Sequence, residues 1–469
     1  MTAPGVEMLL EQLAEKVTAI SLVQVPALAR ETALDAIVDT VGVTIAGVDE
    51  DCVEIVRGVS EGSTGTATLF GAGASASAQN AALINGTAAH ALDFDDCSNT
   101  MGGHPSAPIV PALWALAETE GASGAAFLAA YIAGFEVETK LGRAVNFHHY
   151  EKGWHPTSTL GTFGAAAACA HLLGLPAGQV ANALALAASM AAGLKANFGT
   201  MAKPFHVGQA ARNGLLAAQL ARRGMSANPA ALEDPQGFLE VYNGAGTYEP
   251  SRLLDGFAAP FDLVEPGVAF KRHPCCASTH PAADAMLKIM ADNALHPQDI
   301  VAVRSWTHPR RLRHTNRPDP KSGLDAKFSV QYVLARAALD GVVSLDHFDD
   351  GAISDPRVRA FMHRVHAAPH PEARMDTTEH FFADVEVRTT DGRTFSAFVD
   401  RPLGRDRDHP LPEGALEAKF RDCAGRRLTG EVVEALLTSL YELENLADIR
   451  ALSGLLSGRQ GRMQVRRAG

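Results

Sequence analysis

The sequence predicts a mainly α-helical protein, with a large all-helical domain and a smaller α+β domain. Three observations support this fold class. The chain of 469 residues is too long for one compact core, since cores stop growing at roughly 250–300 residues. The residues up to about 266 are rich in alanine and repeat apolar positions at helical spacing. Strand-like segments appear only after them, and a last helical stretch follows near the end of the chain.

The first region contains several segments with a helical pattern. Apolar residues recur at i, i+3, i+4 and i+7 in Leu34, Ile37, Val38 and Val41, before Gly42 and Gly47. A second run, from about Val207 to Arg223, ends at Gly224, which is typical of a helix C-cap. The segments GAAAACAHLLGL and NALALAASMAAGL are apolar nearly all round, which favours helices inside a helical domain. We therefore expect this region to be all-α.

The pattern changes after Pro266. Residues 300–306 are β-rich, and the Asp391-Gly392 turn separates two further strand-like segments, which predicts a hairpin. Helical spacing returns at 328–339 and from Gly430 to about Leu455. The expected division is a helical domain of residues 1–266 and 405–457, an α+β domain of residues 267–404, and a disordered basic tail of residues 458–469.

Composition excludes several classes of protein. A net charge of -12 argues against a nucleic-acid or anionic-membrane binder, which would present a basic face. The N-terminus carries acidic residues where a secretory signal would be basic, and the longest apolar stretch, Ala125 to Phe135, is too short for a membrane helix. The six cysteines are scattered without a C-x-x-C pair. We expect a cytoplasmic protein with reduced thiols.

The first chemical motif joins His90 to a cluster of carboxylates. Asp93, Asp95 and Asp96 lie within four residues, and His104-Pro105-Ser106 follows shortly after. So many carboxylates repel one another unless a cation or a hydrogen-bond donor faces them. A metal site, a polar catalytic wall and a set of helix caps with salt bridges all fit this pattern.

Two further motifs place a candidate residue at the start of a helix. His155 lies in Gly-Trp-His-Pro-Thr-Ser, where backbone N–H groups could face an anion, although the motif taken alone favours a loop histidine with only a structural role. Lys203 precedes Pro204 and can present its ammonium group to a carboxylate, or lie on a solvated surface. His206 follows on the same helix, where packing is the simpler explanation for it.

The fourth motif brings two cations close to a pair of thiols. Lys271 and Arg272 precede Cys275 and Cys276, so the segment could bind an anion, or the thiols could be core residues. Elsewhere, Gly71-Ala72-Gly73 lacks the third glycine of a dinucleotide-binding loop.

Taken together, these motifs resemble the MmgE/PrpD family in order and spacing, over residues 5 to 455. That family includes 2-methylcitrate dehydratase, cis-aconitate decarboxylase and iminodisuccinate epimerase. The resemblance implies that the α+β domain is a lid, that the protein is a homodimer, and that it uses no metal and no organic cofactor. It also implies a small polycarboxylate as the substrate.

The resemblance also implies a set of site residues. We expect catalytic roles for Asp93, His104, His155 and Lys203, and substrate-binding roles for Cys97, Ser106, Lys271 and His314. Cys97 stands where threonine is usual in decarboxylase-like members, and His314 stands where the decarboxylase has tyrosine. The second departure counts against decarboxylation of cis-aconitate.

The chemistry of the family accounts for these residue types. Proton transfer at a carbon beside a carboxylate spreads negative charge onto oxygen, which Lys203 and Lys271 can stabilise. Histidines can move the proton, and we place this role on His104 and His155 because a proline follows each of them and favours an extended backbone. Asp93 would orient one imidazole.

Several functions remain open on the sequence alone. The first choice is a lyase of the dehydratase or decarboxylase type acting on a di- or tricarboxylic acid, and an epimerase of an amino- or imino-dicarboxylate is the close alternative. A metal-dependent hydrolase would use His90, Asp93, Asp95, Asp96 and His104. A non-catalytic binding protein is the fourth possibility.

Overall fold

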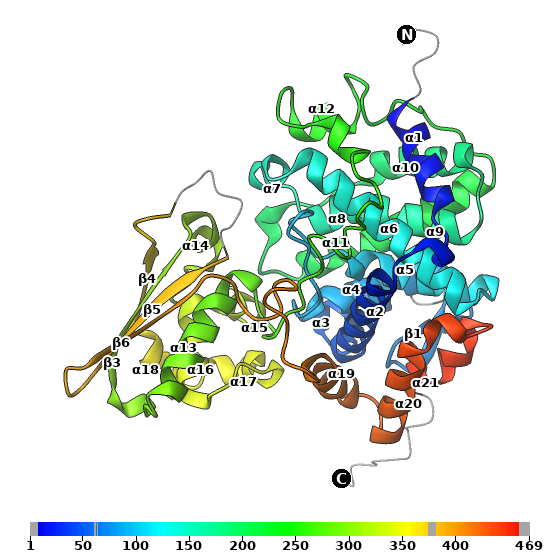
Figure 1. Ribbon diagram of the computed structural model, residues 1–469. Coiled ribbons are helices and arrows are strands. Elements are labelled where there is room, and N and C mark those ends of the chain that lie inside the picture. Colours follow the sequence, from blue (N-terminus) through cyan, green and yellow to red (C-terminus); the bar gives the residue numbers. More distant parts are fainter. Residues whose placement is uncertain (1–7, 61, 63, 374–380, 459–469) are drawn as a thin grey trace. The chain divides into compact units, whose positions relative to one another are not determined.

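The computed structural model describes residues 8–60, 62, 64–373 and 381–458, and the predicted tail from 459 on lies outside these residues. The described chain is mainly helical with small sheets, which confirms the predicted fold class (Figure 1). Contacts divide it into two units. The helical unit is Met1–Ala91, Asp95–Phe270 and Glu413–Gly469, and the mixed unit is Leu92–Phe94 and Lys271–Pro412. The sequence predicts boundaries after residues 266 and 404, and its pattern does not indicate the short Leu92–Phe94 segment.

The helical unit begins with twelve helices and one small hairpin in the described part of the chain before residue 271. The helices are α1 Leu9–Ala19, α2 Ala27–Gly47, α3 Asp51–Val59, α4 Ala78–Ala91, α5 Ser106–Glu120, α6 Gly124–Val145, α7 His148–Lys152, α8 Pro156–Thr159, α9 Gly161–Leu172, α10 Ala177–Met190, α11 Ala202–Arg222 and α12 Phe238–Asn243. Both predicted runs are confirmed, as α2 and α11, and the two alanine-rich segments form α9 and α10.

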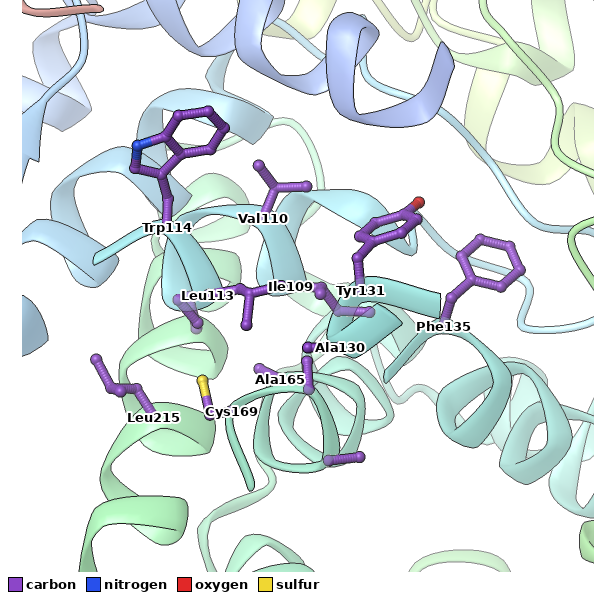
Figure 2. Packing of buried hydrophobic residues seen from close by; sticks show 14 of the residues in the cluster. Ile109, Val110, Leu113, Trp114, Ala130, Tyr131, Phe135, Ala165, Cys169 and Leu215 are labelled. Atoms are coloured by element: carbon purple, nitrogen blue, oxygen red, sulfur yellow. The ribbon is translucent and has the colours of Figure 1, made fainter. Parts of the chain in front are cut away.

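The core of the helical unit is built around α5, α6, α9 and α11. Figure 2 shows Ile109 and Leu113 of α5 pointing toward the side where Cys169 of α9 and Leu215 of α11 lie. These residues are all fully buried, as are the alanines along α9. Small side chains on α9 let the neighbouring backbones approach closely, which explains how a helix without an apolar stripe finds a stable place.

One glycine sets how closely α11 lies on α4. A Cβ atom at Gly208 would be 2.2 Å from the carbonyl oxygen of Leu83 and 2.3 Å from Oγ1 of Thr87. No side chain fits there, so the two backbones pack directly against each other. This contact brings the first turns of α11 beside the end of α4, where His90 lies.

A two-stranded hairpin interrupts the region that we expected to be all-α. Strands β1 Ala67–Leu69 and β2 Ala74–Ala76 pair antiparallel across Gly71 and Gly73, which both have positive φ. The strands are only three residues long, which is too short for a periodic pattern to reveal. The GAG motif is therefore a hairpin turn.

The end of the chain completes the helical unit, with α19 Ala415–Gly425, α20 Gly430–Tyr441 and α21 Ser453–Ser457. Helix α19 packs on α2, where Lys419 forms a buried ion pair with Asp39 at 2.7 Å. The N–H groups of Gly71 and Gly73 donate to the carbonyls of Leu456 and Ser457, each at 2.7 Å. The predicted helical stretch from 430 to 455 is broken by 3-10 turns at Leu443–Asn445 and Ile449–Leu452.

The mixed unit packs helices against a four-stranded sheet. The strands are β3 Ile300–Thr307, β4 Val365–Pro369, β5 Ala383–Thr389 and β6 Thr394–Val399, in the order β4-β3-β5-β6. The helices are α13 His280–Asp292, α14 Pro309–Thr315, α15 Gly323–Ala326, α16 Val330–Asp340, α17 Asp350–Ile353 and α18 Pro356–Met362. The predicted hairpin is confirmed, since β5 pairs antiparallel with β6 around Asp391-Gly392, and the predicted strand at 300–306 is β3.

Two other sequence expectations can be compared with the structure. All six cysteines are free thiols. Among the described residues, no helix combines the length and the apolar character needed to cross a membrane.

The buried pair of Lys419 with Asp39 gives a test of how the end of the chain is held. In Lys419→Met, the buried carboxylate of Asp39 loses its cation, so we expect the free energy of unfolding to fall by about 3–5 kcal/mol in urea denaturation. Lys288→Met is the matched control, because the Lys288–Asp292 pair is exposed and should contribute about 1 kcal/mol or less. Equal losses in the two variants would contradict this account.

Candidate active site

The centre of the candidate site is a buried carboxylate between two histidines. Oδ2 of Asp95 lies 2.7 Å from Nδ1 of His90 and 3.2 Å from Nδ1 of His104. His90 is on the last turn of α4, whereas Asp95 and His104 belong to the loop between α4 and α5. One oxygen therefore fixes two imidazole rings, whose centroids are 4.5 Å apart.

A second pair of histidines lies next to the first. The His155 ring centroid is 5.6 Å from that of His90, and Nδ1 of His155 is 3.3 Å from Nδ1 of His206 on α11. His155 holds the N-cap position of α8, and its own N–H donates to the carbonyl of Gly193 at 3.0 Å. The four histidines come from α4, the loop before α5, the start of α8 and α11.

Lys203 is buried in the first turn of α11 and is not a solvated surface residue. Its Nζ lies 5.4 Å from the centroid of the Phe198 ring, which packs edge-on against His155. The positive charge of Lys203 acts on three of the four rings, those of His90, His155 and His206. This part of the helical unit therefore suits an anion.

Burial and charge keep the inner rings neutral. Burial lowers the pKa of His90 to about 3, although the Asp95 carboxylate acts in the opposite direction. Burial, with His90 and Lys203 nearby, also lowers the pKa of His155 well below its usual value. For Asp95, burial alone would raise the pKa, but the rings of His104 and His90 hold it well below its usual value. The ionised carboxylate of Asp95 thus faces the neutral ring of His90.

The loop that carries His104 is fixed by a second carboxylate. Asp96 accepts hydrogen bonds from the N–H of Ser106 at 3.2 Å and from its hydroxyl at 2.5 Å. The same hydroxyl lies 2.6 Å from that of Tyr131 in α6. Ser106 is completely buried with these partners, and its predicted contact with substrate stays a prediction. Cys97 lies at the wall of the site, with Sγ 3.7 Å from Nδ1 of His104.

Other predicted residues lie together in the mixed unit. Nζ of Lys271 is 3.1 Å from Oδ1 of Asp93 and donates to the carbonyl of Asp93 at 2.6 Å. Asp93 has φ of 52°, a left-handed conformation that aspartate tolerates better than most residues. Lys327 donates to the carbonyl of Leu92. Buried lysines thus hold the Leu92–Phe94 segment within this unit.

His314 contacts two small polar side chains. Its Nε2 is 3.2 Å from Oγ of Ser278 and 3.8 Å from Sγ of Cys276. Cys275 is fully buried, which raises the pKa of its thiol to about 12 and makes it a core residue. The two vicinal cysteines therefore differ, because only Cys276 is partly exposed.

A metal ion is a second chemical possibility at the centre of the helical unit. His90, Asp95 and His104 each offer a ligand atom within 4.8 Å of the others. As the side chains stand, both Nδ1 atoms face the same carboxylate oxygen, which is the geometry of N–H donors. A metal would require lone pairs on the imidazoles, and Nε2 of His90 is a buried nitrogen without a hydrogen-bond partner in the described residues.

The structure brings together some predicted residues and adds others. His104, His155, Lys203 and Cys97 lie in the helical unit, whereas Asp93, Lys271 and His314 lie in the mixed unit. That Lys203 and Lys271 both stabilise the charge of the substrate stays a prediction. His90 and His206 were set aside on the sequence because each lies on a helix; for His206, its position three residues after Lys203 was the available signal.

Two family models match the chain and together cover most of it. The MmgE/PrpD N-terminal domain matches residues 11–251, and the MmgE/PrpD C-terminal domain matches residues 273–442. The gap between the two matches includes the boundary between the two units at residue 270.

The chain is also similar to several characterised enzymes. Cis-aconitate decarboxylase of Homo sapiens is 35% identical over 390 residues, which is 81% of this chain and 79% of that protein. Cis-aconitate decarboxylase of Aspergillus terreus is 26% identical, over 84% of each chain. The mitochondrial 2-methylcitrate dehydratase of Yarrowia lipolytica is 24% identical, over 89% of this chain and 84% of that protein.

The lowered pKa of His90 predicts how stability depends on pH. Between its unfolded value near 6.5 and its folded value of about 3, the unfolded chain binds one proton more at this residue, so stability falls as pH falls through that window. His90→Asn retains a donor but cannot titrate. We expect the slope of unfolding free energy against pH, measured between pH 6 and 4, to decrease by about 1.4 kcal/mol per pH unit.

The exposed His363 provides the control for this measurement, as His363→Asn. If the slope changed no more in His90→Asn than in this control, the buried neutral state of His90 would be wrong.

Proposed function

Because the chain belongs to the MmgE/PrpD family, we propose that it is a lyase that acts on a small di- or tricarboxylic acid. It moves a proton at a carbon next to a carboxylate, and it needs no metal or organic cofactor. The observation that carries this proposal is the pair of rings held by one oxygen of Asp95, with His155 beside them. We assign the roles of acid and base to His104 of this pair and to the neighbouring His155.

The histidines can divide the proton transfer between them. Asp95 holds Nδ1 of His104, and a proton that this ring gains from the substrate is stabilised by the adjacent carboxylate. Nε2 of His155 has no partner in the described residues, so it is available as a base or, when protonated, as an acid. In dehydration, one group takes the proton from carbon and the other protonates the leaving hydroxyl group.

Lysine charge stabilises the carbanion-like transition state. In either elimination or decarboxylation, electrons left on carbon spread onto a neighbouring carboxylate, and a buried ammonium group lowers the energy of that charge. Lys203 supports this role by its burial and by its action on the surrounding rings. Lys271 is the second expected cation, with Asp93 as its partner in the mixed unit.

Two residues bear on the choice of substrate. Cys97 and His314 are the two positions at which the sequence departs from the decarboxylase-like pattern of the resemblance, which has threonine and tyrosine there. His314 contacts Ser278 and Cys276 through Nε2. An imidazole at this position replaces the phenol hydroxyl group that the decarboxylase-like pattern would place there. We therefore propose a lyase of this type without restricting it to cis-aconitate, and epimerisation of an amino- or imino-dicarboxylate remains the alternative outcome.

The remaining expectations concern assembly and location. We propose that the protein is a homodimer, as the family resemblance implies, and that it is cytoplasmic, as the sequence predicts.

Isotope exchange tests the proposed function. The protein is incubated in deuterated water with citrate, methylcitrate, aconitate, iminodisuccinate and tartrate, and products are followed by NMR and mass spectrometry. We expect turnover of one acid, equally before and after exhaustive chelation. A decarboxylated product should carry deuterium at the carbon that lost carbon dioxide, whereas in a dehydration deuterium should appear in the remaining substrate as the reverse reaction returns a solvent proton to carbon. Inversion without loss of a group would identify the epimerase, and activity removed by chelation and restored by metal would identify the metal-dependent hydrolase.

Histidine substitutions test the assignment of the proton-transfer residues. His104→Gln and His155→Gln should each lower kcat by about two to four orders of magnitude, because each removes an acid-base group. Circular dichroism and melting temperature should remain close to those of the wild type. His171→Gln is the control: this partly buried histidine bonds the carbonyl of Ile20, and the amide can retain that contact.

An effect on KM alone would make His104 and His155 binding residues. Unchanged kcat in both variants would move the chemistry elsewhere.

A further inference from the structure

The two ring nitrogens of His155 have different surroundings. Nε2 is buried without a hydrogen-bond partner among the described residues, whereas Nδ1 faces Nδ1 of His206 at 3.3 Å. The side chain of His155 is only 1% exposed. A proton that reaches this ring has one contact through which it can leave, and that contact is His206.

His206 connects this buried ring to the surface. It is partly exposed on the first turns of α11, while His155 is enclosed. Gly193 lets the backbone pass close to Ser158 and His206. It has φ of 126°, and a Cβ at this position would lie 3.0 Å from Cβ of Ser158 and 3.4 Å from Cγ of His206. The hydroxyl of Ser158 donates to the carbonyl of His206 at 3.0 Å. These contacts fix the backbone of His206 beside the helix start that carries His155.

The proposed reaction requires such a connection. When a carbon–carbon bond breaks and carbon dioxide leaves, the electron pair stays on carbon and must be joined by a proton from solvent. When a proton is removed from carbon, the base must release it again before the next turnover. A neutral imidazole enclosed by His90, His104 and Lys203 is a poor place to keep positive charge.

We propose that His206 is a proton-relay residue that carries protons between solvent and Nε2 of His155. In the outward direction, Nε2 of His155 accepts a proton, its Nδ1–H is transferred to Nδ1 of His206, and Nε2–H of His206 is released to water. The reverse sequence delivers a solvent proton to the substrate carbon. Each ring exchanges one N–H for the other, so no net charge stays in the interior. Both rings then hold the opposite neutral tautomer, and proton exchange with water that enters when the product leaves restores the starting tautomers before the next turnover.

The other histidines do not offer this route. Nε2 of His90 is itself buried without a partner in the described residues, and its Nδ1 is engaged by Asp95. Nδ1 of His104 faces the same carboxylate. His206 acts through His155, not on the substrate. The relay rests on the proposed function, because it requires that His155 exchanges protons with a substrate.

A substitution that retains the contact but not the transfer tests the relay. In His206→Asn, the amide can still hydrogen-bond to Nδ1 of His155, but it cannot pass a proton. With the acid found in the isotope-exchange experiment, kcat should fall by about 100-fold and KM should change less than about twofold. Imidazole in the buffer should restore much of the rate of His206→Ala, because a free base replaces the missing ring.

The controls separate the relay from a structural role and from the proposed function. His171→Asn should retain wild-type kcat, and His155→Ala should remain slow in imidazole because it lacks the ring that the relay serves. Normal kcat in His206→Asn, or a slow His206→Ala that imidazole does not accelerate, would overturn the relay while wild-type turnover still supported the lyase. Wild-type protein without turnover or exchange on any acid would instead overturn the proposed function.

Discussion

The hydrogen bonds accepted by Oδ2 of Asp95 are the constraint on which the candidate site depends. They join the end of α4 to the loop before α5 and fix His90 and His104 in one orientation. A buried carboxylate without such donors would gain a proton, because burial opposes its charge. Here the two rings keep it ionised, and it in turn fixes which of their nitrogens face inward. Charge and geometry therefore depend on each other at this point.

Two other buried acids of the helical unit, Asp96 and Glu138, favour the protonated form, in contrast to Asp95. Burial raises the pKa of Asp96 and of Glu138 well above their usual values, and neither oxygen of Glu138 has a hydrogen-bond partner in the described residues. Asp96 is still useful when neutral, because it ties both ends of the His104 loop through Ser106. Two neighbouring residues of one acidic motif thus have different roles. Asp95 is the charged group beside the histidines, and Asp96 fixes the conformation of the loop that carries His104.

The fold was more predictable than the site. Long periodic segments such as α2 and α11, and the turn between β5 and β6, gave correct predictions because their patterns are local. The hairpin β1–β2 was missed because its strands are short. His104 and His155 stand out in loops before proline, but His90 and His206 lie on helices, where packing is the common explanation for a histidine. Their role depends on how closely α4 and α11 approach at Gly208, which only the folded chain reveals.

The pairing of the chain's last helix with an early hairpin has a consequence for synthesis on the ribosome. Gly71 and Gly73 find their acceptors only in Leu456 and Ser457, and Asp39 meets its cation only when residue 419 has emerged. By contrast, most of the mixed unit is one continuous segment, from Lys271 to Pro412, that is translated before those residues. The helical unit therefore cannot make these contacts until its last helices have been synthesised, after most of the mixed unit.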